Sequence, residues 1–170
     1  MSELENLIIK RAGELLGSGE VQRVVGWKKG EFCFDPSPAT FENAEELKDF
    51  VYNPFCGANL SKYLIEVSKK EGKTAVFLKP CDTYSFNELV KEHRVKRENV
   101  YVVGIECQGK VDIEKIKEKG VSAVTSAEEK DGKVIVSSVY GENVFDKNDL
   151  LLIKCKTCKS KKFAVSDETI

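Results

Sequence analysis

The residues of this sequence that could do chemistry are its cysteines. The chain has six of them, and four stand in positions that suit metal binding: Cys81, Cys107, Cys155 and Cys158. Thiolate sulfur is a preferred ligand of iron–sulfur clusters and of structural zinc. The sequence therefore predicts a cysteine-ligated centre, and this pattern alone leaves both an iron–sulfur cluster and a four-cysteine zinc site open.

The expected fold brings Cys81 and Cys107 together. Each cysteine follows an apolar run that predicts a strand, at 74–78 and at 99–105, and the segment 83–93 between them has a helical pattern. A strand, helix and strand in this order predict a parallel pair, whose carboxyl ends meet at one edge of the sheet. We therefore expect the two thiols to lie at this edge.

The other two cysteines form the sequence Cys-Lys-Thr-Cys after the apolar run 150–153, which we interpret as the last strand. Two residues between Cys155 and Cys158 allow both sulfur atoms to bind one metal ion or cluster. A redox dithiol is a third interpretation, but no apolar helix follows the pair to lower the pKa of a nucleophile. Nearby lysines are expected to favour the thiolate form: Lys79, Lys154, Lys156 and Lys159.

The remaining cysteines and the single histidine have other expected roles. Cys56 precedes a predicted helix at 57–70, whose N-terminal dipole would favour a thiolate, so Cys56 is the reserve ligand. Cys33 lies between two phenylalanines in strand-like alternation, and we expect a structural role. His93 belongs to a polar helix surface and is expected to be solvated.

Composition excludes several classes of function. The chain has one histidine and no nucleophile elbow, Walker loop or dinucleotide glycine motif, so neither hydrolysis nor phosphate-loop binding has a motif. The 27 Lys and Arg nearly balance the 28 Asp and Glu, which gives no broad reason to expect nucleic acid. Apolar runs are too short for membrane insertion and no leader opens the chain, so we expect a cytoplasmic protein.

The fold expected from these patterns is α/β: a single domain over 1–170, with a mixed sheet, a central parallel βαβ unit and helices packed on it. Residues 1–19 hold an N-terminal helix, and 154–170 form a tail that carries the cysteine pair. The other expected elements are a strand at 21–28, a loop or edge segment at 32–41, a helix near 112–119, and a hairpin or mixed edge from 121–125 and 134–139.

The cysteine segments of this chain resemble the coenzyme F(420)-reducing hydrogenase/dehydrogenase beta-subunit family, which includes beta subunits of formate dehydrogenases. The resemblance is carried by four segments: 52–63 (YNPFCGANLSKY), 78–82 (LKPCD), 95–109 (from VKRENV to GIECQG) and 155–158 (CKTC). By position, the four expected ligands match cysteine motifs of that family. Its members are iron–sulfur flavoproteins that pass electrons between a cluster, FAD and a deazaflavin coenzyme.

The resemblance implies that the chain is an electron-transfer protein or oxidoreductase subunit with a [4Fe-4S] cluster, rather than a complete enzyme. Its expected partners are other redox subunits of a hydrogenase- or dehydrogenase-type complex. Tyr84 stands where the family often has arginine, and the chain stops soon after the cysteine pair. These departures argue against FAD, which the resemblance otherwise allows. The alternative is a zinc-stabilised four-cysteine module that uses the basic run 154–162 to contact a protein or nucleic-acid phosphates.

Overall fold

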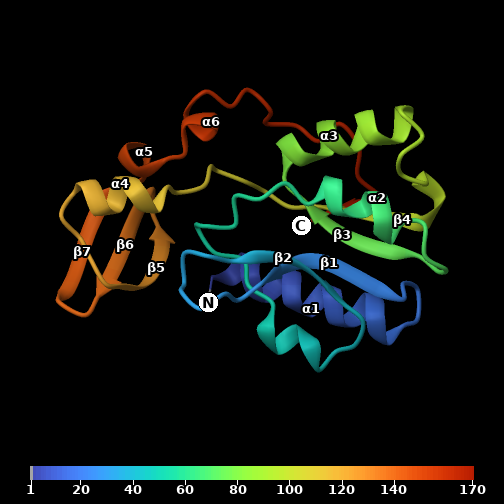
Figure 1. Ribbon diagram of the computed structural model, residues 1–170, viewed down its shortest axis with the longest axis horizontal. Helices are drawn as coiled ribbons and strands as arrows, with labels where there is room; N and C mark the ends of the chain where they lie inside the picture. The colour runs from blue at the N-terminus through green and yellow to red at the C-terminus, as the bar shows by residue number, and fades with distance from the viewer. Residues whose placement is uncertain (1) are drawn as a thin grey trace.

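The computed structural model describes residues 2–170, which form two β-sheets surrounded by helices (Figure 1). The larger sheet has the order β2-β1-β3-β4-β8; β3 is parallel to β1 and β4, β8 is parallel to β4, and β2 pairs with β1 in the antiparallel direction. Its strands are β1 (Arg23–Lys28), β2 (Ser37–Phe41), β3 (Thr74–Leu78), β4 (Val100–Gly104) and β8 (Glu168–Thr169). The predicted mixed sheet is confirmed.

The centre of this sheet is the predicted βαβ unit. Helix α3 (Pro80–Lys91) connects β3 to β4, and the two strands pair in parallel from Thr74 opposite Val100 to Leu78 opposite Gly104. All five residues of β3 are buried, as expected of a parallel strand that is covered on both faces. The parallel pair and its helix are therefore as predicted.

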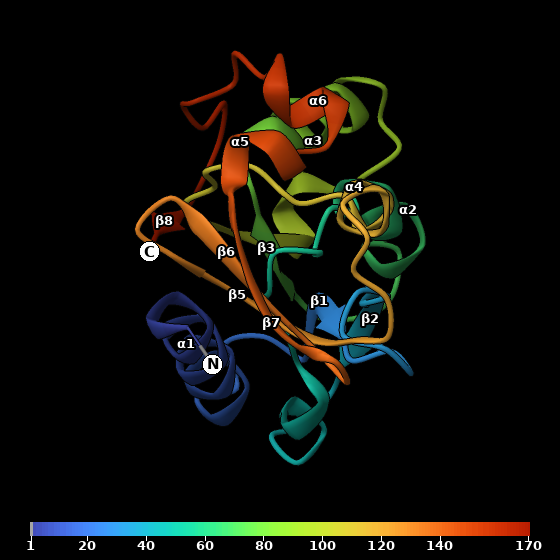
Figure 2. The same cartoon turned by 90° about the vertical axis from the view of Figure 1, so that its left-hand side faces the viewer.

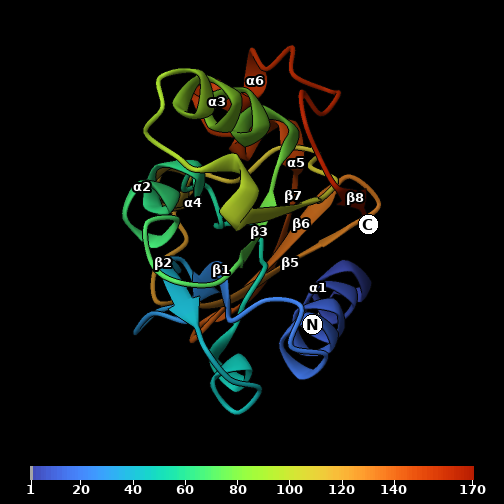
Figure 3. The ribbon, with the colours of Figure 1, turned by 90° about the vertical axis from the view of Figure 1, so that its right-hand side faces the viewer.

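Helices cover both faces of the larger sheet (Figures 1 and 3). Helix α1 (Glu3–Gly17) lies on one side, and the short α2 (Leu64–Val67) and α3 lie on the other. The predicted N-terminal helix is confirmed, and Ser2 caps it by accepting a hydrogen bond from the backbone NH of Glu5. None of the helices in residues 2–170 is long and apolar enough to cross a membrane.

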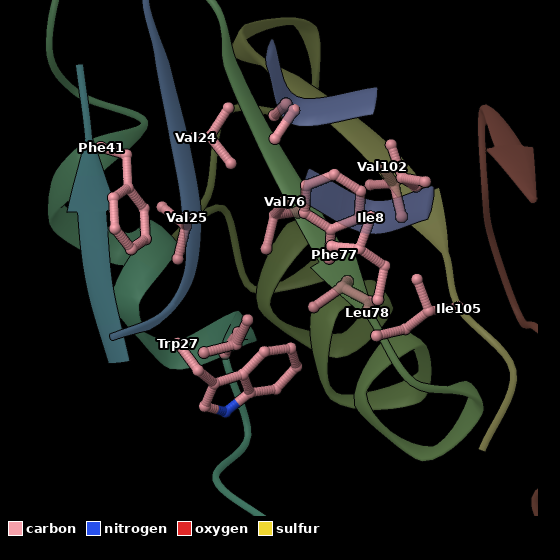
Figure 4. Close-up of a cluster of buried hydrophobic side chains, with 14 of the residues drawn as sticks. Ile8, Val24, Val25, Trp27, Phe41, Val76, Phe77, Leu78, Val102 and Ile105 are labelled. Carbon is pink, nitrogen blue, oxygen red and sulfur yellow. The ribbon is translucent and has the colours of Figure 1, made fainter. Parts of the chain in front are cut away.

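The main core lies on both faces of the larger sheet, against α1 on one side and against α2 and α3 on the other (Figure 4). Ile8 from α1 packs against β-branched and aromatic residues of the central strands, and Trp27 closes the end of the cluster. Val76, Phe77 and Trp27 are 0% exposed. Burial of such side chains stabilises a fold by about 1.5–3 kcal/mol each, so this core fixes the strands whose ends carry the cysteines.

A second, three-stranded antiparallel sheet stands beside the first (Figure 2). It consists of β5 (Val124–Lys130), β6 (Lys133–Ser138) and β7 (Gly141–Asp146), with α4 (Ile113–Glu118) and α5 (Lys147–Leu150) beside it. Asp131 and Gly132 form the two-residue turn between β5 and β6, both with positive φ, at 51° and 73°. This is the geometry that a type I′ hairpin turn requires. The predicted hairpin is thus part of a small sheet with its own core cluster.

The chain departs from prediction at its last apolar run. The pattern of 150–153 predicts a strand, but Leu150 ends α5, Leu151 forms only an isolated bridge with Val111, and α6 (Ile153–Lys156) follows. Asp146 caps α5 by accepting a hydrogen bond from the backbone NH of Asn148, which starts a helical turn. Leu150 and Leu151 are then buried beside the small sheet without entering it.

One other prediction is wrong in its local structure. The predicted helix at 57–70 is reduced to a 3₁₀ turn, η2 (Ser61–Tyr63), followed by the single turn α2. The predicted loop or edge segment at 32–41 is confirmed: Cys33 lies in a loop, and the edge strand β2 begins at Ser37. The other 3₁₀ turns are η1 (Glu46–Asp49) and η3 (Arg97–Asn99). His93 follows the end of α3 and is exposed.

Candidate cysteine site at the ends of two parallel strands

The register of β3 and β4 sets the positions of the first two cysteines. Leu78 is paired with Gly104, and Cys81 and Cys107 each follow these paired residues by three positions. Both thiols therefore lie at the carboxyl end of the sheet, close enough for the charge of one to raise the pKa of the other. Pro80 is the first residue of α3, where its missing NH costs nothing, so Cys81 stands in the first helical turn.

The surroundings of Cys81 oppose the expected thiolate. The Cys81 side chain is exposed, but partial desolvation raises the pKa of its thiol to about 12; the Asp82 carboxylate adds to this rise, and Lys79 only partly offsets it. Lys79 thus lowers the pKa of Cys81, as expected, but partial burial and the Asp82 charge outweigh it. A metal or cluster would have to displace the proton of this thiol, which makes metal binding dependent on pH.

The direct contacts of Lys79 are with Asp82, a backbone carbonyl and an aromatic ring. Its Nζ lies 2.8 Å from Asp82 Oδ2, with both side chains only 3% exposed, and donates a 2.8 Å hydrogen bond to the carbonyl of Ala58. The ammonium also lies 4.4 Å from the centroid of the Trp27 ring, a cation–π distance. This buried pair fixes the first turn of α3, in which Cys81 lies.

Cys155 approaches the same end of the sheet from the small-sheet side. Its Sγ accepts a hydrogen bond from the backbone NH of Lys110 at 3.4 Å. Gly109 has φ +102°, and a Cβ there would lie 2.6 Å from Leu151 Cδ2. Only glycine suits that backbone and that close approach. The loop after β4 therefore lies directly against the segment that carries Cys155.

A buried lysine lies between the cysteine segments. Lys110 donates through Nζ to the carbonyl of Asn53 at 3.0 Å, and the same atom lies 3.7 Å from the centroid of the Tyr52 ring. Burial lowers the pKa of Lys110 to about 8, although nearby Cys56 and Cys107 raise it in part. A cation in this position favours negative charge on the surrounding sulfur atoms.

Cys158 is held by local contacts. Its backbone NH donates to the Cys155 carbonyl at 3.3 Å, and its Sγ donates to the Ser160 carbonyl at 3.7 Å. Within the described chain, the hydrogen bonds of 157–161 all stay inside 153–161. No three Cys, His, Asp or Glu side chains of residues 2–170 stand close enough together to hold a metal ion. The four-cysteine ligand set stays a prediction.

The other two cysteines are packed into the protein. Cys56 is 0% exposed, and its Sγ accepts a 3.3 Å hydrogen bond from the backbone NH of Asn53. Burial raises the pKa of Cys56 to about 11, and no helix begins directly after it, so the expected helix dipole is absent. Cys33 is half-buried, and its carbonyl accepts a hydrogen bond from Asn53 Nδ2 at 2.8 Å. The geometry of Cys33 suits a structural role.

A pocket of about 650 Å³ opens beside Cys107. Tyr52 and Lys110 line it from the main-sheet side, and Ser126 to Glu129 line it from β5. This volume is within the range of about 300–1,000 Å³ that is usual for small-molecule sites. Solvent and small ligands therefore have access to the cysteine end of the sheet.

Two features of this site were not predicted from the sequence. Lys110 follows a glycine in a polar loop, where a solvated lysine would look the same, so only the fold shows that it is buried. Asp82 belongs to the Leu78–Asp82 segment that carries the family resemblance, but its ion pair with Lys79 is not among the predictions. The spacing of three residues at a helix start is the signal that could have indicated this pair.

Comparison with known proteins identifies relatives of the chain. It is 30% identical over 136 residues to the beta subunit of the F420-dependent formate dehydrogenase of Methanocaldococcus jannaschii, covering 76% of this chain and 36% of the relative. It is 32% identical over 97 residues to the beta subunit of F420-dependent formate dehydrogenase 1 of Methanococcus maripaludis, covering 57% and 25%. The chain belongs to the F420 beta-subunit family. The family that the sequence resembles is thereby confirmed.

A solved structure shares the fold of this chain. A chain of the F420-reducing [NiFe] hydrogenase complex of Methanosarcina barkeri aligns with a TM-score of 0.68 and 16% identity, over 90% of this chain and 62% of that chain. At this identity the match shows the fold alone. No protein-family model matches the chain. The chain spans only about a quarter to a third of the length of the two curated relatives.

Proposed function

We propose that this chain is an oxidoreductase subunit that holds an iron–sulfur cluster and relays electrons within a larger complex. The proposed ligands are Cys81, Cys107, Cys155 and Cys158. The observation that supports this most strongly is that Cys81 and Cys107 both lie just beyond the paired ends of β3 and β4. Cys155 is hydrogen-bonded to the loop that follows β4. The relatives are subunits of F420-dependent dehydrogenases, in agreement with this role.

The donor set fits a [4Fe-4S] cluster in its chemistry. Four thiolates are the usual ligands of such a cluster, and a cluster supplies one-electron transfer when it is bound. The backbone NH of Lys110 donates to Cys155 Sγ, and hydrogen bonds to sulfur tune the reduction potential of a cluster. The buried ammonium of Lys110 would offset part of the negative charge of the thiolates.

The chain must rearrange locally to complete the site, because the thiols are not yet close enough to share a metal. The segment 157–161, with only local hydrogen bonds, is the part that can move at least cost. Cys158 would then join the other thiols, while Leu151 and the Gly109 loop keep Cys155 in place. Each thiol loses its proton on binding.

Anaerobic purification with metal and sulfide analysis tests this proposal. The expected results are about four iron ions and about four inorganic sulfide ions per chain, with a visible absorption band that bleaches on reduction. Stoichiometric zinc without colour in an anaerobic preparation would instead support the structural four-cysteine zinc module. In an aerobic preparation we expect zinc or a Cys155–Cys158 disulfide, because exposed clusters and thiols are oxidised.

FAD is a further expectation that the family allows. The pocket beside Cys107 has room for part of such a cofactor and is lined on one side by the Tyr52 ring. Tyr84 in place of the frequent arginine argues against flavin binding. Release of a fluorescent flavin on denaturation of the anaerobically purified protein tests this expectation. The cytoplasmic location and the partner subunits likewise stay proposals.

A further inference from the structure

Positive charge is concentrated around the cysteine pair. Residues 154–162, named here the lysine segment, hold five of the 27 Lys and Arg of the chain and none of its 28 Asp and Glu. All five lysines of the segment are exposed: Lys154, Lys156, Lys159, Lys161 and Lys162. The rest of the chain carries more acidic than basic residues. The charge of this protein is therefore segregated, although its net charge is close to zero.

The charge of the lysine segment is not neutralised within the protein. None of its five ammonium groups forms an ion pair with an acidic side chain of residues 2–170. Other exposed lysines do so, for example Lys69 with Glu66 and Lys91 with Glu88, each at 2.8 Å. Unpaired charges of one sign repel each other, and an oppositely charged partner would relieve this repulsion.

Exposed apolar side chains accompany this charge. Ile153, two residues before Cys155, is 75% exposed, and Tyr84, one helical turn after Cys81, is 48% exposed. Two residues after the lysine segment, the backbone NH of Ala164 donates to Thr83 Oγ1 at 2.9 Å, so the chain that leaves the segment lies against the first turn of α3 (Figure 3). Apolar contacts surrounded by charge are the usual composition of a protein interface.

We propose that the lysine segment, together with Tyr84 and Ile153, is the docking surface for a small acidic electron-transfer protein. This inference rests on the proposed function, because the surface surrounds the cysteines to which that function assigns the cluster. Complementary charge would steer the partner to this end of the molecule and raise the rate of association. A partner docked here would lie against the thiols of Cys81 and Cys155.

Nucleic acid fits this surface less well. Sequence-independent binding of single strands uses aromatic side chains as stacking platforms, and Tyr84 is the only aromatic residue of the proposed surface. Outside the lysine segment the acidic residues outnumber the basic ones, so a long polyanion that extended beyond the segment would meet repulsion. A compact acidic protein would contact the lysine segment, Tyr84 and Ile153 without extending over the acidic remainder of the chain.

The test measures binding of a purified acidic [2Fe-2S] ferredoxin, used as the probe, to the full chain by calorimetry. We expect binding that weakens as salt is raised. The variant Lys161→Glu/Lys162→Glu should weaken binding at least about tenfold at low salt, in line with charge-pair effects at interfaces. The two substitutions lie outside the Cys-x-x-Cys sequence, so they leave the ligands intact.

The matched control is Lys70→Glu/Lys73→Glu, which changes the net charge equally. These exposed lysines precede β3, at the opposite end of the strand from Cys81. The control should change affinity less than about twofold, because its charges lie more than a Debye length of about 10 Å from the docked partner. Equal losses in both variants, or no binding by the unmodified chain, would overturn the proposal, as would displacement of the ferredoxin by duplex DNA at equal concentration.

This outcome is separable from that of the proposed function. Calorimetry detects docking whether the site holds iron, zinc or no metal, while iron and sulfide analysis of the same samples reports the cluster. A chain with zinc that still binds the ferredoxin through the lysine segment would refute the electron-transfer role and retain the docking surface. A chain with a complete cluster and no charge-dependent binding would support the electron-transfer role and refute the docking surface.

Discussion

Lys79 Nζ lies 2.8 Å from Asp82 Oδ2 in a setting where both side chains are only 3% exposed. The pair spans the first turn of α3, and Cys81 stands between its two members. A buried ion pair stabilises a fold weakly, but removal of one partner leaves an uncompensated charge. The geometry of Cys81 therefore depends on the integrity of this pair.

Asp82→Asn is expected to destabilise the metal-free protein by about 3–5 kcal/mol, because it leaves the Lys79 charge buried without a counter-ion. Unfolding by urea, followed by circular dichroism, measures this loss. The control is Glu88→Gln, which breaks the exposed Lys91 pair on the same helix and should cost less than about 0.5 kcal/mol. A cost for Asp82→Asn as small as that of the control would contradict the buried pair.

Replacement of any of the four proposed ligands by serine should remove or degrade the cluster. A hydroxyl is a harder and much less acidic ligand than a thiol, so it does not replace thiolate. Iron and sulfide per chain, after anaerobic reconstitution, are the measurement for Cys81→Ser, Cys107→Ser, Cys155→Ser and Cys158→Ser.

The matched controls for this series are the two remaining cysteines. Cys33→Ser should retain full iron, because Cys33 is attached to Asn53 through its backbone and not its thiol. Cys56→Ser should also retain iron but lose about 1–3 kcal/mol of stability, since Cys56 is 0% exposed. Full iron and sulfide after loss of both Cys155 and Cys158 would refute the four-cysteine assignment.

The ion pair between Arg11 and Glu168 predicts a pH dependence. Arg11 Nε lies 2.7 Å from Glu168 Oε1, so this ion pair connects α1 to β8. The hydrogen bond from Arg11 lowers the pKa of Glu168 below its ordinary value of 4.5. A carboxylate with a lowered pKa adds stability above the ordinary pKa, and this contribution is lost as the pH falls through the lowered value.

Glu168→Gln is therefore expected to cost about 1–2 kcal/mol at neutral pH, after allowance for the partial exposure of the pair. The difference between the two proteins should shrink progressively below pH 4.5, as Glu168 of the unmodified chain is protonated. Urea unfolding over this pH range provides the measurement. Glu66→Gln, in an exposed pair with Lys69, should show almost no difference at any pH. A Glu168→Gln cost that stays constant with pH would contradict the prediction.

The contact between Gly104 and Phe163 predicts a coupled pair of substitutions. A Cβ on Gly104 would lie 2.9 Å from the Phe163 ring, which is closer than real Cβ contacts. Gly104→Ala should displace the ring and cost about 1–3 kcal/mol, as overpacking usually does. Thermal unfolding measures this cost.

Phe163→Ala is the partner substitution in a double-mutant cycle. Once the ring is removed, Gly104→Ala has nothing to displace and should cost clearly less than it does in the unmodified chain. Additive costs would show that the two residues are not coupled. Because Phe163 follows the lysine segment closely, the same variants should also retain less iron after reconstitution if this contact positions Cys158.

The sequence by itself determined the central βαβ unit and the position of two cysteines. The runs before Cys81 and Cys107 are apolar over the full length of a buried parallel strand, and a helical pattern lies between them. These signals are local, and parallel strands then place both carboxyl ends at one edge. The family was also visible in the sequence, because its motifs are short segments around these cysteines.

Only the tertiary structure decided the rest of the site. The run 150–153 has the composition of a strand, but Asp146 starts a helical turn before it, and Leu150 is buried in the core cluster of the second sheet. Lys110 has no local signal of burial, because the Tyr52 ring and the Asn53 carbonyl that surround its ammonium come from a segment more than 50 residues earlier. Contacts between distant segments determine burial, and burial lowers the pKa of Lys110.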